Sequence, residues 1–237
     1  MSWLRKAKVA DDAAAEVEEV AEAVADGETE AAPGAGTTGP FDEADAPAGG
    51  RRIDLGSLRL PVVPNLAVRM EVDRKSGRPV AVTLNHEGST MQLQAFAAPR
   101  TLGVWDDVRA ELAGQATANG GTAKEIEGRF GTELAAELPA KTADGKQGKR
   151  RVRFIGVDGP RWFLRGVIGG KAATDKAAAK LLEDVFAGAV VVRGSAAHPP
   201  RELLPLTLPG ARPAATEASQ GDPLALLRRG PEITEVR

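Results

Sequence analysis

The order in which two hydrophobic periods follow each other constrains the fold of this chain more than any other feature. Apolar and polar residues alternate in three stretches between residues 68 and 96, the pattern of strands with one buried face. Apolar residues then recur at three- and four-residue steps over 105–116, which is helical spacing. Four further strand patterns fill 126–168, a second helical pattern covers 174–186, and 189–192 close the series as a strand. Runs of strands separated by single helices predict an α+β fold, because a doubly wound parallel sheet would alternate strand and helix.

Turn and cap residues divide these patterns. The segment Lys75–Pro79 predicts a hairpin turn, and Asn119-Gly120-Gly121 predicts a left-handed end to the first helix. Thr174 is the expected N-cap of the second helix. Glu133 and Glu137 alternate with apolar positions, so we expect both carboxylates to face water. The expected fold is a single-domain sandwich, mainly antiparallel, with two core helices.

The charges are divided unevenly along the 237 residues. Residues 1–50 carry three basic and twelve acidic side chains, a net charge of −9, whereas residues 51–237 carry 28 basic and 21 acidic side chains, a net charge of +7. Residues 33–50 are also rich in Gly and Pro, as linkers are. We therefore divide the chain into a disordered acidic tail and linker (1–50), an α+β domain (51–208) and a flexible C-terminal tail (209–237).

The composition argues against most enzyme classes. With no cysteine, the chain cannot form a disulfide, a thiolate metal site or a cysteine nucleophile. His86 and His198 lie in polar sequence without catalytic spacing, and we expect both in solvent-exposed loops. Gly166–Ala172 departs from the phosphate-loop spacing and is interpreted as a Gly-rich turn. We therefore expect no catalytic residues, no metal and no cofactor.

No stretch of the sequence approaches the roughly eighteen apolar residues that a membrane-spanning helix needs. The first twelve or so residues lack the hydrophobic region of a secretory signal, which predicts a cytoplasmic protein. Trp3 and Leu4 lie beside three basic residues, but this apolar patch is too narrow for us to expect peripheral membrane binding.

One basic segment is the candidate binding site. Residues 141–165 hold eight basic side chains against two acids, with Trp162 and Phe163 among them. Bases on strands beside aromatic rings can bind phosphates and stack nucleobases, which predicts a polyanion site. The alternative is that the two aromatics are core residues on opposite faces, while the bases form a solvated edge that resists aggregation. The residues predicted to bind the polyanion are Lys149, Arg150, Arg151, Arg153, Arg161 and Arg165.

The terminal segments contain three candidate docking residues. Phe41 is the bulky apolar residue of the linker and could dock on the body or on a partner. Leu224 and Leu227 lie in an amphipathic turn that could enter a groove of another protein, and the alternative is a frayed terminus. The acidic segment 11–45 could fold back over the basic segment, so that a polyanion would have to displace it.

Five strings of sequence resemble a known family. They are DLGSLRLP (54–61), MQLQAFAAPR (91–100), WDDVRAEL (105–112), GRFGTELAAELP (128–139) and VRFIGVDGPRWFLRGVIGGKAA (152–173). Through them the chain resembles the actinobacterial domain of unknown function 3710 family over roughly residues 38–208. This resemblance implies a cytoplasmic protein with an acidic variable tail and no assigned activity. The order of elements is also similar to the PsbP-like sandwich shared with the Ran-binding Mog family, whose members act mainly in binding and assembly.

The sequence therefore predicts a cytoplasmic, non-enzymatic binding or assembly protein with an unidentified protein partner. The alternative is a nucleic-acid or nucleotide-binding accessory factor that uses the basic segment 141–165. An enzyme would instead need a deep polar pocket in which His86 or His198 meets carboxylates.

Overall fold

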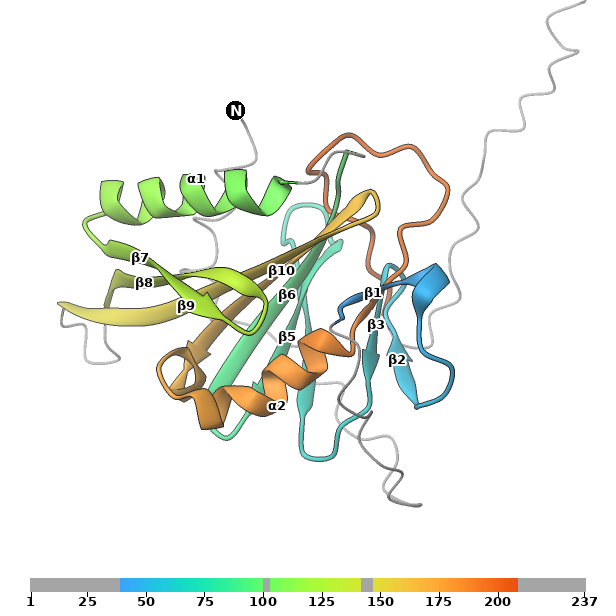
Figure 1. Ribbon diagram of the computed structural model, residues 1–237, viewed down its shortest axis with the longest axis horizontal. Coiled ribbons are helices and arrows are strands. Elements are labelled where there is room, and N and C mark those ends of the chain that lie inside the picture. The colour runs from blue at the N-terminus through green and yellow to red at the C-terminus, as the bar shows by residue number, and fades with distance from the viewer. Residues whose placement is uncertain (1–38, 100–102, 142–146, 209–237) are drawn as a thin grey trace, which may run out of the picture.

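A seven-stranded sheet, a four-stranded sheet and two α-helices make up the described part of the chain (Figure 1). The structure is a computed structural model that describes residues 39–99, 103–141 and 147–208. The large sheet has the strand order β4-β5-β6-β10-β9-β8-β7 and is antiparallel. Its strands are β4 (Ala67–Val72), β5 (Pro79–His86), β6 (Ser89–Ala97), β7 (Thr122–Gly128), β8 (Gly131–Lys141), β9 (Gln147–Gly159) and β10 (Trp162–Gly170).

The small sheet has the order β1-β11-β3-β2, in which the β1–β11 pair is parallel and the other pairs are antiparallel. Its strands are short: β1 (Phe41–Asp42), β2 (Arg52–Asp54), β3 (Leu58–Pro61) and β11 (Val190–Val191). The helices are α1 (Val104–Ala118) and α2 (Lys176–Ala187), with 3₁₀ turns η2 (Glu43–Asp45) and η3 (Lys171–Ala173). The predicted α+β fold with a mostly antiparallel sheet is confirmed.

The large sheet has a core on each face, because successive residues of a strand point to opposite sides. The small sheet and α2 pack on one face, where Leu164 and Phe186 belong to a single buried cluster. Helix α1 packs on the other face, where its Trp105 contacts Phe163 of β10 with ring centroids 6.0 Å apart. Trp162 lies in the first cluster and Phe163 in the second, so these neighbouring aromatics are core residues on opposite faces.

Each helix begins at a capping carboxylate. In α1 the local cap position is Gly103, which has no side chain to offer, and Asp158 at the end of β9 accepts hydrogen bonds from the backbone amides of Gly103 and Trp105. In α2 the N-cap is Asp175 and not the predicted Thr174, because the Asp175 carboxylate accepts from the amide of Ala177 at 2.8 Å. Helix α1 ends as predicted, with Gly120 at a φ of 77°.

The folded body begins earlier than the predicted boundary after residue 50. Phe41 and Asp42 form β1 and pair with Val190 and Val191 of β11. The Asp42 carboxylate also accepts a hydrogen bond from the indole Nε1 of Trp162 at 2.7 Å. Backbone pairing and a polar anchor therefore place residues 39–50, which we had assigned to the linker, within the small sheet and its approaches.

Near the end of the described chain, residues 198–208 cross the molecule as an extended strap. The amide of Leu204 donates to the carbonyl of Ala95 at 2.9 Å, and Leu204 and Leu206 are buried. Leu224 and Leu227 lie outside the described residues. Among the elements in residues 39–99, 103–141 and 147–208, no helix has both the length and the apolar character needed to cross a membrane.

Candidate functional site

The six predicted polyanion-binding residues do not share one surface. Lys149, Arg150 and Arg151 lie at the start of β9, whereas Arg161 lies in the turn after the other end of that strand. Arg151 and Arg161 are ten positions apart, which corresponds to about 34 Å of extended chain. Arg153 and Arg165 occupy opposite faces of the sheet between these ends.

Arg153 is a structural residue. Its guanidinium donates to Glu133 at 2.8 Å and also to Glu183 of α2, and only 7% of the residue is exposed. The prediction that Glu133 faces water is wrong, because Glu133 is fully buried beside this arginine. Burial raises the pKa of Glu133 even though Arg153 acts in the opposite direction. This ion cluster ties β8 and β9 to α2 and leaves Arg153 no access to a polyanion.

Arg165 faces the α1 side of the sheet. Its guanidinium donates to the side-chain oxygen of Gln94 and lies 5.4 Å from the ring centroid of Phe96. Its Nε is buried without a hydrogen-bond partner, and burial lowers the pKa of Arg165 to about 10. Because the Arg165 guanidinium is buried on the α1 side of the sheet, it cannot bind the same polyanion as the bases at the start of β9.

The aromatic residues of the basic segment cannot stack on bases from solvent. Trp162 is 1% exposed and Phe163 is 2% exposed. Each ring fills one of the two cores, which is the alternative that the sequence left open. The stacking platform that single-stranded nucleic acids require is therefore not formed by this pair.

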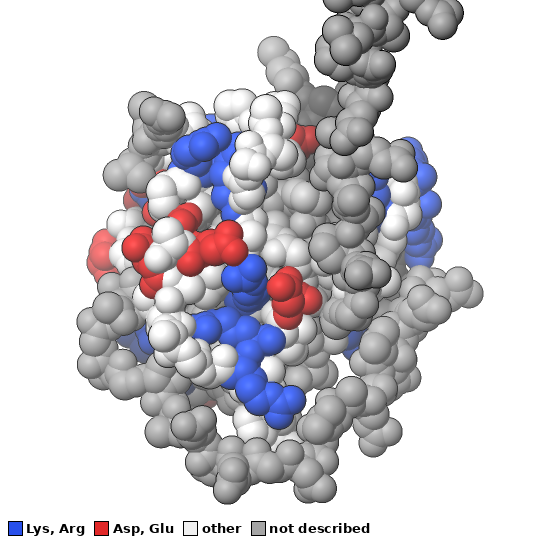
Figure 2. Space-filling view, turned by 90° about the vertical axis from the view of Figure 1, so that its right-hand side faces the viewer, with Lys and Arg blue, Asp and Glu red and all other residues white. Residues whose placement is uncertain are grey.

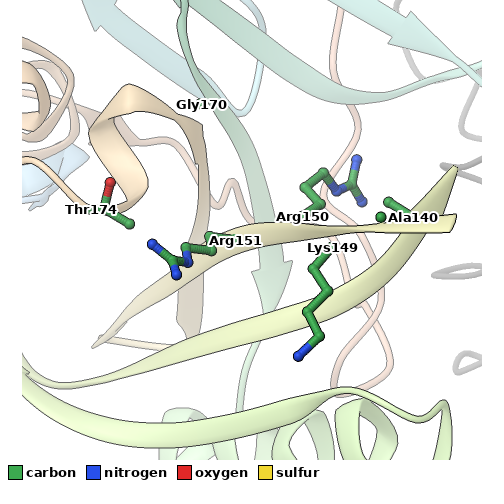
Figure 3. A pocket seen from close by; sticks show the side chains of 7 residues that line it. Ala140, Lys149, Arg150, Arg151, Gly170 and Thr174 are labelled. Atoms are coloured by element: carbon green, nitrogen blue, oxygen red, sulfur yellow. The ribbon is translucent and has the colours of Figure 1, made fainter. Parts of the chain in front are cut away.

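Lys149, Arg150 and Arg151 border a hollow at the free edge of β9. Strand β10 pairs with β9 as far as the pair Ile168–Arg153 and then turns away into η3, so no described strand covers this edge from Gln147 to Val152. Gly170 makes the turn with a φ of 69°, and a Cβ atom there would overlap the carbonyl oxygen of Gly88. The result is an open hollow of about 470 Å³ (Figure 3), lined by Ala140, Gly148, Lys149, Arg150, Arg151, Gly170 and Thr174.

The hollow carries a net positive charge. Glu137 of β8 lies 2.8 Å from Arg151 Nε and 3.5 Å from Lys149 Nζ, and hydrogen bonding to Arg151 lowers the pKa of Glu137. Arg150 points to the other side of the strand (Figure 3), and no described acid forms an ion pair with it. Among the described residues, three bases around the one carboxylate of Glu137 leave an excess of two positive charges. Lys149 and Arg151 remain well exposed, with side-chain exposures of 70% and 66%.

The charge pattern differs on the side of the molecule that carries the small sheet. Figure 2 shows Lys and Arg side chains beside Asp and Glu side chains among the described residues of that side. Arg59 of β3, for example, lies 3.0 Å from Glu43 and 3.4 Å from Asp54. Ion pairs of this kind neutralise one another locally, so this side offers less attraction to a polyanion than the start of β9 does.

The two histidines are both less exposed than expected. His86 ends β5, and its Nδ1 lies 3.3 Å from the carbonyl oxygen of Asn65. His198 lies in the strap, where its Nδ1 is 3.1 Å from the carboxylate of Glu202. Their side-chain exposures are 18% and 17%, because each ring packs against a local polar partner. In the described ranges, no group of three or more His, Asp or Glu side chains could hold a metal ion.

The site predicted from the sequence omitted four residues that line the hollow: Ala140, Gly148, Gly170 and Thr174. The paired glycines at 169–170 were the available signal, since a left-handed glycine at the end of a strand marks a change of direction. What the sequence could not indicate is that β9 continues after β10 has left it. The polyanion prediction therefore narrows from six residues to Lys149, Arg150 and Arg151, and Gly170 supplies the turn that opens the hollow.

Comparisons with known proteins extend this description. No curated protein sequence matches the chain. The solution structure of cyanobacterial PsbP (CyanoP) from Synechocystis sp. PCC 6803 is similar with a TM-score of 0.36 and 10% sequence identity, over 68% of this chain and 98% of that one. A family described as a protein of unknown function, DUF3710, matches residues 39–215. The match begins at the cis Gly39–Pro40 bond that opens the folded body and runs past the strap. The chain therefore belongs to the DUF3710 family.

Proposed function

We propose that this protein is a non-enzymatic, cytoplasmic binding protein that takes an extended, acidic segment of a protein partner at the free edge of β9. One observation carries the proposal: three adjacent bases lie on a strand whose outer edge is left open where β10 turns away. The backbone of this edge supplies hydrogen-bonding groups, and the bases supply charge.

The backbone argument rests on strand addition. An unpaired strand edge is a template on which an extended peptide can form main-chain hydrogen bonds. The open part of β9, from Gln147 to Val152, is about 20 Å long at the usual rise of a strand and is held in place on its other side by β8. A peptide of about six residues would match this length.

The charge argument gives the partner its sign. Lys149 and Arg151 lie on one side of β9 and Arg150 on the other, so an added strand would meet bases on both of its faces. Acidic side chains at alternating positions of the added strand lie on one face, where they would pair with Lys149 and Arg151, whereas a basic or neutral strand would not. Such exposed pairs contribute little affinity each, but they select the partner and speed association.

A nucleic-acid or nucleotide partner is the alternative function. Lys149, Arg150 and Arg151 could equally bind phosphates, which are the main source of affinity for nucleic acids. The burial of Trp162 and Phe163 argues against it, because bases would have no aromatic partner among the sequence-predicted residues.

A binding experiment with the full chain tests the proposal. The probe is a fluorescent twelve-residue peptide of alternating Glu and Val, measured by anisotropy against a peptide in which every backbone amide is N-methylated, so that neither of its edges can donate main-chain hydrogen bonds. Both peptides carry the same charge, but only the first can pair as a strand. We expect the unmethylated peptide to bind at least tenfold more tightly, and a single-stranded oligonucleotide of equal charge to bind more weakly than that peptide.

Matched variants locate the site. Replacing Lys149, Arg150 and Arg151 with Gln should abolish the binding, because the substitutions remove all three bases. Replacing Arg69, Lys75 and Arg78 with Gln removes the same charge from the β4–β5 hairpin, at the opposite edge of the sheet, and should leave binding unchanged. Equal loss in both variants, or equal affinity for the two peptides, would contradict strand addition at β9. Tighter binding of the oligonucleotide would favour the alternative function.

A further inference from the structure

We infer that the acid-rich segment 11–30 of this same chain occupies the hollow at the start of β9 when no partner is bound. This inference rests on the proposed function, since it names the segment with which a partner must compete. The chain would then carry its own weak competitor for the site.

Charge complementarity is the first support. Residues 11–30 contain nine acids and no base, and they form the larger part of the longest run of one sign in the sequence, the twelve acids from Asp11 to Asp45. The hollow has three bases around the single carboxylate of Glu137, and Lys149 and Arg151 are exposed to whatever approaches. The attraction between unlike charges of this number is large at low ionic strength and is screened within about 10 Å at 0.1 M salt.

Two of the three later acids of the predicted tail are engaged elsewhere, and the third, Asp45, lies beside them in η2. Asp42 binds the indole of Trp162, and Glu43 forms an ion pair with Arg59 of β3. Both contacts lie on the small-sheet side of the molecule, away from the start of β9. The prediction that the whole segment 11–45 covers the basic residues is therefore too broad, and only the acids up to Glu30 remain available for the hollow.

The length of chain before the body is sufficient. Asp42 is held at Trp162, which lies opposite Gly159 at the far end of β9. From Gly159 back to Arg151 the strand spans about 27 Å. The nine residues from Gly39 back to Glu30 reach about 30 Å when extended. Glu30 can therefore arrive at the hollow, and the eight acids that precede it can lie along its bases.

This arrangement makes binding depend on competition. A tethered segment acts at an effective concentration in the millimolar range, so even a weak contact can occupy the site for much of the time. A partner that offers backbone pairing in addition to charge would displace it, whereas a partner that offers charge alone would be excluded. The segment would thus act as a filter for strand-forming partners.

Carbodiimide cross-linking of the full chain tests the contact directly, because the reagent joins an amine to a carboxylate that is already in contact with it. Lys149 Nζ lies 3.5 Å from Glu137, so the Lys149–Glu137 link serves as an internal positive control. In the monomer we expect additional links from Lys149 to acids of residues 11–30, which mass spectrometry would identify and which high salt would suppress. Links from Lys149 to Glu137 alone would overturn the inference.

A second measurement uses the alternating Glu–Val peptide and full-length variants in which selected Asp and Glu residues are replaced with Asn and Gln. Converting the nine acids of residues 11–30 to amides should tighten peptide binding about three- to tenfold, as removal of a tethered competitor does. Converting Glu217, Asp222, Glu232 and Glu235 near the C-terminus should not. Equal affinity in all three proteins would overturn the inference and leave the proposed function standing. Absence of peptide binding in every protein would overturn the proposed function, and the cross-linking result would still decide whether residues 11–30 contact Lys149.

Discussion

Two arginines on opposite faces of the large sheet differ in their counter-charges, and this difference should appear in stability. Arg153 is paired with Glu133 and Glu183, so Arg153→Met would leave two acids without their cation and should cost about 3–5 kcal/mol of unfolding free energy. Among the described residues, the one hydrogen-bond acceptor of Arg165 is the side-chain oxygen of Gln94, so Arg165→Met should change the stability by less than about 1 kcal/mol. Urea denaturation of the two variants measures both values. Similar losses would contradict this distinction.

At the same scale, the sequence predicted some positions and not others for a physical reason. The period of two correctly assigned Trp162 and Phe163 to opposite faces as one alternative, because alternation depends only on neighbours in the strand. The burial of Glu133 could not be predicted in this way, since its counter-ion Arg153 comes from the next strand and Glu183 from α2. Pairing between distant residues decides whether a polar position is buried, and a local pattern does not contain it.

At the scale of elements, α1 depends on a cap that it does not itself provide. Asp158 accepts from the amides of Gly103 and Trp105, and its charge also lies at the positive end of the helix dipole. Asp158→Ala should therefore destabilise the protein by about 0.5–2 kcal/mol and speed hydrogen exchange in the first turn of α1. Asp158→Asn keeps a hydrogen-bond acceptor but loses the charge, so its stability should lie between those of the native protein and Asp158→Ala. Unchanged exchange at Trp105 in Asp158→Ala would show that the cap is dispensable.

The order of the elements was predictable because a long segment shows its secondary structure in its own hydrophobic period. The antiparallel meander of β4, β5 and β6 and both helices occur where the sequence placed them. The short strands were harder, since β1 is two residues long and pairs in parallel with a strand near the other end of the body. A pair of this kind is specified by the packing of the finished sheet, and its own residues carry little signal.

At the scale of the whole molecule, three carboxylates give the stability a definite pH dependence. Burial raises the pKa of Glu133, so this group adds stability as the pH falls through its folded pKa towards the ordinary value of 4.5. The pKa of Glu137 is lowered, chiefly by Arg151; burial acts to raise the pKa of Asp184, but Lys180 and Arg129 outweigh it. These two groups therefore lose stability as the pH falls below their unfolded values.

We accordingly expect a stability maximum in mildly acidic solution, which urea denaturation between pH 3 and pH 8 would locate. Glu133→Gln removes the titrating group while keeping its shape, so its stability relative to the native chain should increase as the pH rises above about 4.5. The descending acidic limb should remain in this variant, because Glu137 and Asp184 are unchanged. A stability difference between the two proteins that is constant with pH would show that Glu133 does not titrate as its burial implies.

The parallel pairing of β1 with β11 bears on how the protein is completed during synthesis. At about 5–20 residues per second, the roughly 150 residues that separate these strands take some 8–30 s to emerge from the ribosome. Until then β3 also lacks β11, its neighbour towards β1, and the Leu58 and Leu60 side chains of β3, buried in the finished protein, lack part of their cover. The nascent chain thus exposes an unfinished apolar face for much of its translation. The net charge of −9 on residues 1–50, which are synthesised first, gives neighbouring nascent chains a like-charge repulsion that opposes their association.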